Sequence, residues 1–249
     1  MITDSFDIST EPLMSPKDLI GEQQHICDIC LCTFSHVIFH EVIKNYPCEK
    51  ISEIRAANGT KSIYAFMLGN RKIAINLMGI GSTLASNDVI EINWLIGATK
   101  FIMFGSAGNL NCAATEGKYV IPTEAYRDEG MSYHYAPPAD YIKVRNADKL
   151  SAIFDEIKAP YIAGRVWTTD AFYRETRGEV AKRQKEGCLA VEMEVAGVQA
   201  VCDFHGFQLY DFLQTGDVLD APAWEGSKLD GANHDLDKFL LALEIAKRI

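Results

Sequence analysis

The chain has 249 residues, of which 48% are hydrophobic and 23% charged, and its net charge is −10. This composition is typical of a folded globular protein and excludes a disordered or fibrous chain. The acidic balance, without any long basic stripe, argues against nucleic acid as a partner. No apolar run is long enough to span a bilayer and the first residues do not resemble a secretory signal, so we expect a cytoplasmic protein without membrane contact.

Apolar runs of strand length alternate with amphipathic helical patterns along the chain. The predicted strands are 26–34, 72–78, 101–104, 119–121, 161–168, 189–193 and 209–213. The predicted helices are 84–96, 148–157, 178–185, 195–204 and 236–249. This alternation predicts an α/β fold with a mixed, largely parallel central β-sheet flanked by helices.

No linker, repeat or low-complexity tract divides the chain, so we predict one domain over residues 21–249. Residues 1–20 contain two prolines and no periodicity, which indicates an N-terminal arm. The odd number of cysteines, seven, favours reduced thiols. Cys27, Cys30 and Cys32 fit a buried strand better than a zinc clip, since no second Cys/His pair follows at finger spacing, and we expect no metal ion.

Two glycine-containing turns follow predicted strands, at the strand ends where open α/β sheets bind ligands. They are Gly79-Ile80-Gly81, before a helix, and Gly105-Ser106-Ala107-Gly108. Bare backbone N–H groups and a hydroxyl suit an oxyanion or phosphate. Leu84 stands where a dinucleotide fingerprint needs its third glycine, so a nicotinamide site is set aside. Taken alone, either turn is more often a structural turn than a binding site.

Two further strand ends carry carboxylates. Glu192-Met193-Glu194 follows one apolar run, and Asp217 follows another. A carboxylate can accept both hydroxyl protons of a ribose, while a methionine packs under the sugar. The alternative for the glutamates is a first helical turn, where negative charge suits the helix dipole. Asp217 is either a turn cap or a general acid with a raised pKa.

In this order, these motifs resemble the type I nucleoside phosphorylase superfamily, which includes purine nucleoside phosphorylases, uridine phosphorylases and methylthioadenosine/S-adenosylhomocysteine nucleosidases. The resemblance covers residues 79–224 and also includes Thr169-Asp170-Ala171-Phe172-Tyr173. It implies a phosphorylase-like fold, with Asp217 as the catalytic acid that protonates or hydrogen-bonds N7 of a departing purine. The other implied contacts are Glu192, Met193 and Glu194 for ribose, Phe172 and Tyr173 for the base, and Gly81, Gly105 and Ser106 for phosphate.

The spacing between Glu194 and Asp217 is that of the purine enzymes and the nucleosidases. The Gln-x-Arg pair of uridine phosphorylases is missing after Tyr173, so a purine is favoured. The sequence departs from the family's pattern at the positions that bind phosphate. Met103 stands in place of a family arginine, and Cys32-Thr33-Phe34-Ser35-His36 replaces the early phosphate loop. Phosphate would then bind Ser106 and backbone N–H groups, with His36 or Arg55. The early glutamate of the nucleosidases is missing too, which leaves phosphate and water open as the nucleophile.

The resemblance therefore implies phosphate-dependent cleavage of the N-ribosidic bond of purine nucleosides, giving free base and ribose 1-phosphate. No cofactor is expected, and phosphate is a co-substrate. The alternatives are hydrolysis of the same bond, phosphorolysis of uridine, and a nucleoside-binding module without turnover. The resemblance also implies a homo-oligomer with shared sites. The segment 127–135 is rich in polar and aromatic groups, and we expect it to reach the 5′ side of its own or a neighbour's nucleoside, although a lone histidine such as His134 is more often a surface or core residue.

Overall fold

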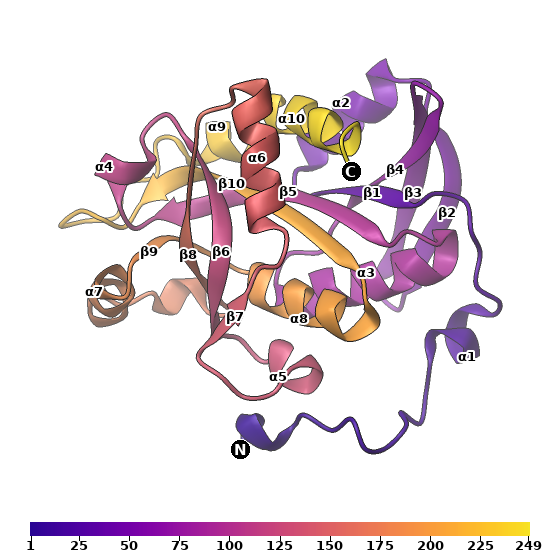
Figure 1. Cartoon of the computed structure of the whole chain (residues 1–249), viewed down its shortest axis with the longest axis horizontal. Coiled ribbons are helices and arrows are strands. Elements are labelled where there is room, and N and C mark those ends of the chain that lie inside the picture. Colours follow the sequence, from indigo (N-terminus) through magenta and orange to yellow (C-terminus); the bar gives the residue numbers. More distant parts are fainter.

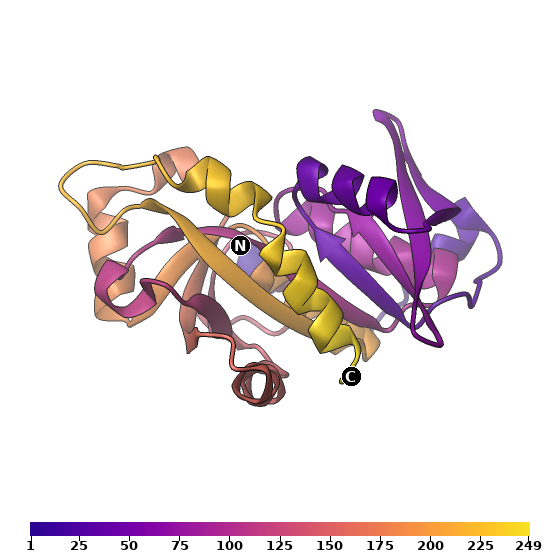
Figure 2. The same ribbon diagram turned by 90° about the horizontal axis from the view of Figure 1, so that it is seen from above.

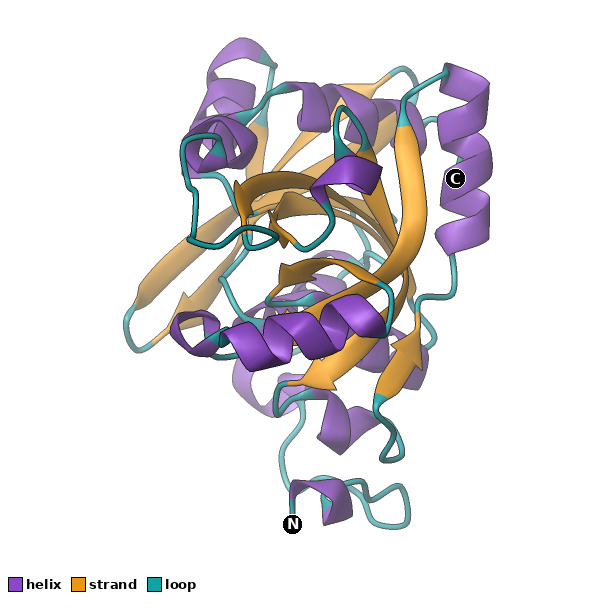
Figure 3. Cartoon of the chain, turned by 90° about the vertical axis from the view of Figure 1, so that its left-hand side faces the viewer, coloured by secondary structure: helices purple, strands orange, loops and turns teal.

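All 249 residues are described by the computed structural model, in which ten strands form one sheet. The order is β10-β6-β8-β9-β5-β1-β4-β3-β2, with β7 on β6 and an additional pairing of β10 with β5. Because β5 pairs with both β10 and β9, this half of the sheet curls into a barrel-like layer (Figure 3). The strands are β1 Ile29–Thr33, β2 Glu49–Ala56, β3 Gly59–Leu68, β4 Arg71–Leu77, β5 Lys100–Asn109, β6 Tyr119–Asp128, β7 Tyr141–Lys143, β8 Tyr161–Thr169, β9 Cys188–Glu192 and β10 Gln208–Val218.

Helices flank both faces of the sheet (Figures 1 and 2). The helices α3 Ser82–Ile96 and α8 Val195–His205 pack together on one face. The helices α2 His36–Asn45, α6 Ala147–Ile157 and α10 Asp237–Ala246 pack on the other. The short elements are η1 Ile2–Asp4, α1 Pro16–Ile20, α4 Cys112–Thr115, α5 Ser132–Tyr135, η2 Phe172–Arg174, α7 Arg177–Lys185 and α9 Leu229–His234. The predicted α/β fold with a mixed sheet between helices is confirmed.

Each predicted strand and helix corresponds to an observed element with shifted ends, but α2, β2, β3 and β7 were missed, as were the short elements η1, α1, α4, α5, η2 and α9. Helix α2 begins after Ser35, whose hydroxyl accepts from the Ile38 N–H at 3.1 Å, and it buries only a narrow apolar stripe. Strands β2, β3 and β7 lie towards the edges, where exposed polar residues interrupt the apolar pattern. The strand prediction failed there because an edge strand needs little apolar surface.

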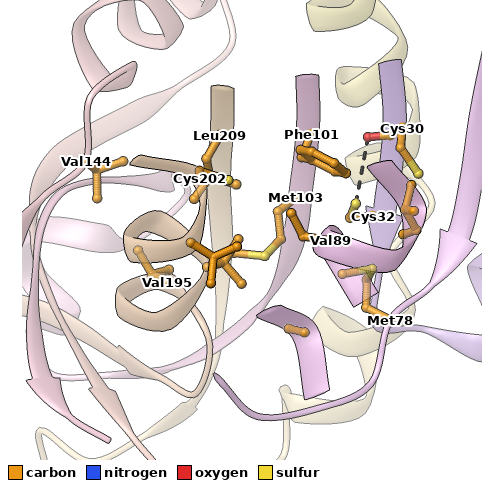
Figure 4. Packing of buried hydrophobic residues seen from close by; sticks show 14 of the residues in the cluster. Cys30, Cys32, Met78, Val89, Phe101, Met103, Val144, Val195, Cys202 and Leu209 are labelled. Carbon is orange, nitrogen blue, oxygen red and sulfur yellow. Dashed lines mark hydrogen bonds between the residues drawn. The ribbon is translucent and has the colours of Figure 1, made fainter. Parts of the chain in front are cut away.

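Two buried clusters hold the helices to the sheet, one on each face. Cys30 and Cys32 lie in the cluster under α3 and α8, and both are fully buried in β1, as predicted for small apolar residues. Met103 lies in the same cluster with Val89 of α3 and Val195 of α8 (Figure 4). All seven cysteines are free thiols.

Residues 1–20 run along the outside of the body, and the first of them approach α5 (Figure 1). The arm exposes large apolar side chains, namely Ile8, Leu13, Met14 and Leu19. None of the helices is both long and apolar enough to cross a membrane.

Candidate active site

A cleft of about 1240 Å³ opens where β1, β5, β9 and β10 end. The strands β1, β5 and β10 are parallel, so their carboxyl ends meet at one edge of the sheet. Strand β9 crosses the end of β5 through the pair Gly108 and Val191, which brings the β9–α8 turn to the same edge. The predicted site residues that line the cleft are Gly105, Ser106, Phe172, Tyr173, Glu192, Met193, Glu194 and Asp217. Nearly all of the predicted site is therefore assembled in one cleft.

Glu194 occupies the position just before α8, with only 8% of its surface exposed. The backbone N–H of Gly81 donates to Glu194 Oε1 at 2.6 Å. Gly81 has φ 98°, a left-handed conformation that favours glycine. Burial raises the pKa of Glu194, and the negative charge of Asp170 adds to the rise. Because the Gly81 N–H already binds Glu194, Gly81 orients the predicted ribose carboxylate, and its phosphate contact stays a prediction.

Glu192 uses its carboxylate inside the protein. Oε2 accepts from the backbone N–H groups of Glu194 at 2.6 Å and Val195 at 2.7 Å, and Oε1 accepts from the Thr168 hydroxyl. Burial and the nearby charge of Glu194 raise the pKa of Glu192. The bonds to the first N–H groups of α8 are those of a helix cap. The two glutamates thus differ: Glu192 anchors the turn, and Glu194 is the one hydrogen-bonded across to the Gly81 turn.

Met193 is held between these two glutamates by a contact between helices. The Ser82 hydroxyl donates to the Met193 carbonyl at 3.0 Å. A Cβ on Gly197 would lie 2.8 Å from Ser82 Cβ, so α3 and α8 approach each other closely only because position 197 is glycine. This packing fixes the turn that carries the predicted ribose contacts.

Asp217 enters the cleft from the end of β10, where the register with β5 shifts. The indole N–H of Trp224 donates to Asp217 Oδ2 at 2.8 Å. A Cβ on Gly108 would lie 3.5 Å from Asp217 Oδ1 and 2.8 Å from Val191 Cγ1. The glycine is therefore required by the close approach of Val191 and of Leu219, whose Cδ1 would lie 2.6 Å from a Cβ, while Asp217 would be in ordinary contact.

Phe172 and Tyr173 stand on η2 at the mouth of the cleft. Their rings lie 3.9 Å apart with a 36° tilt, and the side chains are 49% and 90% exposed. Core packing, the ordinary role of such a pair, is excluded by this exposure. Their contact with a base stays a prediction.

Glu175 follows η2 and lines the same cleft, although sequence reasoning gave it no role. Burial, together with the negative charge of Asp217, raises the pKa of Glu175 to about 7. No regular spacing links position 175 to position 217, so only the fold reveals this second carboxyl beside the predicted acid.

Ser106 contacts helix α9 within the same cleft. The Ser106 hydroxyl donates to Asn233 Oδ1. Asn233 lies 127 residues further along the chain, on a helix that was not predicted, so no sequence signal pointed to it.

Two imidazoles lie near Ser106 in the same cleft. Ser35 Oγ lies 2.8 Å from His234 Nδ1, and the rings of His36 and His234 pack edge to face at 5.4 Å. The Ser35 hydroxyl also accepts from the backbone N–H of Ile38 at 3.1 Å, so the same side chain begins α2 and holds the His234 ring. Nε2 lies 3.7 Å from Asp230 Oδ1. Two imidazoles therefore line this part of the cleft.

Three residues considered earlier do not line this cleft. Met103 is 2% exposed and packs in the core (Figure 4). Arg55 lies on the exposed strand β2 and pairs with Glu53 at 2.8 Å, so the expectation that it binds phosphate within its own chain is wrong. His134 lies on α5, outside the cleft of its own chain.

Asp211 is a buried carboxyl of β10, beside Met103 of β5 in the sheet. It is 1% exposed, and neither of its oxygens has a hydrogen-bond partner. Burial and the charges of Glu192 and Glu194 raise the pKa of Asp211 well above its usual range. Asp211 is therefore a buried carboxyl group behind the cleft lining, on which the charges of Glu192 and Glu194 act.

The fold and cleft place the chain among known proteins. Residues 29–236 match the family model of the phosphorylase superfamily, so the chain belongs to that superfamily, and the resemblance inferred from the sequence is confirmed. A DeoD-type purine nucleoside phosphorylase of an Exiguobacterium species is 25% identical over 174 residues, covering 68% of this chain and 73% of the relative. A 5′-methylthioadenosine/S-adenosylhomocysteine nucleosidase of Buchnera aphidicola is 30% identical over 181 residues, covering 68% of this chain and 72% of the relative. Relatives thus carry the names of both phosphorylases and nucleosidases.

Proposed function

We propose that this protein cleaves the N-ribosidic bond of purine nucleosides with phosphate as the nucleophile. The observation that carries the proposal is that Glu194 and Asp217, from two different strand ends, line one cleft. Glu194 would accept the ribose hydroxyls, with Met193 beneath the sugar, and Asp217 would face the departing base. A cleft of about 1240 Å³ has room for a nucleoside and an anion together.

The chemistry needs charge stabilisation at both ends of the breaking bond. Positive charge grows on the ribose, and electrons of the C1′–N9 bond move to the base. Phosphate would lie near Ser106 and the two imidazoles, and its oxygen would form the new bond to C1′. Ribose 1-phosphate and free base are the products. The chemistry proposed here uses only phosphate and protein side chains.

Hydrolysis of the same bond is the second candidate. It is favoured by Met103, an apolar core residue at the position where phosphorylases carry an arginine. The relative from Buchnera aphidicola bears a nucleosidase name, which is consistent with this alternative.

One assay separates these functions. Base release from inosine, adenosine and uridine is followed with and without phosphate. Release that requires phosphate and yields ribose 1-phosphate supports the proposal, and release without phosphate means hydrolysis. Faster base release from uridine than from inosine or adenosine would contradict the purine assignment and identify a uridine phosphorylase. Tight nucleoside binding without release identifies a binding module and overturns the enzyme assignment.

We further propose a homo-oligomer that works in the cytosol, with a neighbour's residues completing the site. The exposed apolar side chains of the arm support packing against another subunit. Free thiols at every cysteine suit a reducing compartment. Light scattering of the full chain tests the assembly, and a monomer at assay concentration would contradict it.

A further inference from the structure

A buried ion pair, which the chemistry proposed above does not use, binds the turn between β4 and α3. Asp88 lies on α3 and is 4% exposed. Its Oδ2 accepts from the backbone N–H of Gly79 at 2.8 Å, and its Oδ1 accepts from Nζ of Lys61 on β3. Neither Asp88 nor Lys61 lines the cleft, so any effect of this pair on a ligand must pass through the turn.

The same turn holds the proposed ribose contacts on its other side. The Gly81 N–H donates to Glu194 Oε1 at 2.6 Å, and the Ser82 hydroxyl donates to the Met193 carbonyl at 3.0 Å. The N–H that Asp88 binds and the N–H that Glu194 binds therefore belong to one short turn. A shift of the turn at one of these bonds moves the donor at the other.

The turn is also packed tightly against the start of α3. A Cβ on Gly79 would lie 2.6 Å from Leu84 Cβ, so the chain can fold back here only with glycine. The Ala85 N–H donates to the Gly81 carbonyl at 3.0 Å, and Asp88 lies one helical turn beyond Leu84. The Asp88 carboxylate thus fixes Gly79 relative to the helix on which the turn is folded.

Stability alone does not account for this pair. Burying a carboxylate costs free energy, and a buried ion pair gives little more net stability than apolar side chains of similar size. An ion pair does supply direction, because Lys61 and the Gly79 N–H bind different oxygens of Asp88. Burial raises the pKa of Asp88, and the hydrogen bonds from Lys61 and Gly79 oppose that rise. The carboxylate is therefore held in one orientation between β3, α3 and the turn.

We propose that Asp88, oriented by Lys61, is a positioning residue that sets the Gly79–Gly81 turn and, through it, the orientation in which Glu194 meets the two ribose hydroxyls. This inference rests on the proposed function and deepens it, because it assigns the preference for ribonucleosides over 2′-deoxyribonucleosides to a network that begins on β3. A carboxylate that binds two hydroxyls must face both, whereas one hydroxyl can be bound in more orientations.

The first test compares Asp88→Asn with Asp88→Leu, two uncharged side chains of similar size. Asparagine keeps an oxygen that accepts from the Gly79 N–H, and leucine does not. The measured quantity is kcat/KM for inosine divided by kcat/KM for 2′-deoxyinosine. We expect this ratio to fall about tenfold in Asp88→Leu, mainly through a higher KM for inosine, and to change less than about twofold in Asp88→Asn.

Two further variants separate positioning from stability. Asp28→Leu is the matched control, since Asp28 also pairs with a lysine, Lys100, at 3.0 Å and lies outside the cleft. We expect it to keep the wild-type ratio. The double variant Asp88→Leu/Lys61→Met leaves no unpaired charge, so its stability to denaturant should exceed that of Asp88→Leu while its ratio stays low.

A second readout does not depend on turnover. Nuclear magnetic resonance of the protein labelled with ¹⁵N-glycine and ¹³C-methionine identifies Gly79, because Met78-Gly79 is the only Met-Gly step in the sequence. The Gly81 signal is identified as the one that Glu194→Ala shifts most. Amide protons bonded to carboxylates resonate downfield. We expect both signals to move upfield in Asp88→Leu, and the Gly81 signal to stay in place in Asp88→Asn and Asp28→Leu.

The outcomes keep the two levels of inference apart. A Gly81 signal that does not move in Asp88→Leu shows that the pair does not reach Glu194, and it overturns the proposal even in an active enzyme. A folded Asp88→Leu or double variant with the wild-type ratio overturns the role in selectivity. If the wild type releases no base from any nucleoside, the proposed function fails and the selectivity role with it. The glycine signals still decide whether Asp88 sets the turn.

Discussion

The backbone N–H of Gly81 donates to Glu194 Oε1 at 2.6 Å, joining two turns that lie 113 residues apart in the chain. One turn begins α3 and the other begins α8, and these helices pack directly against each other. Only one oxygen of Glu194 is used in this bond, so the other is available to a ligand. The predicted ribose contact is thus oriented by the backbone of a distant strand end.

Glu194→Ala tests the ribose contact. We expect the KM for inosine to rise by about 10- to 100-fold, since hydrogen bonds to a charged group contribute roughly 1.5–3 kcal/mol. The effect on 2′-deoxyinosine should be smaller, because one of the two hydroxyl partners is missing. Steady-state kinetics with both substrates measure this, and equal losses on the two nucleosides would contradict a diol contact.

Glu192→Ala should mainly reduce stability. The substitution leaves the N–H groups of Glu194 and Val195 and the Thr168 hydroxyl without their acceptor. We expect a loss of about 2–3 kcal/mol in the free energy of unfolding, measured by denaturant titration. Glu192→Gln retains an acceptor oxygen and should lose less. A variant as stable as the wild type would show that Glu192 does not hold the start of α8.

Asp211→Asn should change how stability depends on pH. The pKa of Asp211 is raised in the folded protein, so between its unfolded value near 4 and its folded value the native state binds more protons than the unfolded state. Stability from this group is therefore present at low pH and is lost as pH rises.

We expect the wild type to lose more stability than Asp211→Asn between pH 5 and pH 8, by about 1–3 kcal/mol. Unfolding curves at both pH values measure the difference. Parallel pH profiles for the two proteins would show that Asp211 is ionised in the fold and has a partner.

His234→Gln tests the proposed phosphate end of the cleft. We expect the KM for phosphate to rise about tenfold, because the variant removes an imidazole from the proposed phosphate end of the cleft. The KM for inosine should stay within about twofold, since the ribose contacts are on other elements. His40→Gln, on the exposed part of α2, is the matched control. A rise confined to the nucleoside KM would place His234 at the sugar instead.

The alternation of apolar runs with helical periodicity was sufficient to predict the α/β class and the main strands and helices. The apolar runs 72–78 and 209–213 lie within or against β4 and β10, because a buried parallel strand must be apolar on both faces. Edge strands β2 and β3 lacked that pattern and were missed. The order of glycine, acidic and aromatic motifs was also enough to indicate the superfamily.

The sequence by itself determined which chemical groups follow the strands: a Gly-Ser turn, a Glu-Met-Glu turn and an aspartate. Only the tertiary structure decided that the Glu192 carboxylate caps the start of α8 and that Arg55 lies away from the cleft. It also decided that Glu175, Asn233 and His234 line the cleft. The physical reason is that contacts between side chains far apart in the sequence depend on strand order and helix packing. Hydrophobic periodicity reports only on residues close together along the chain.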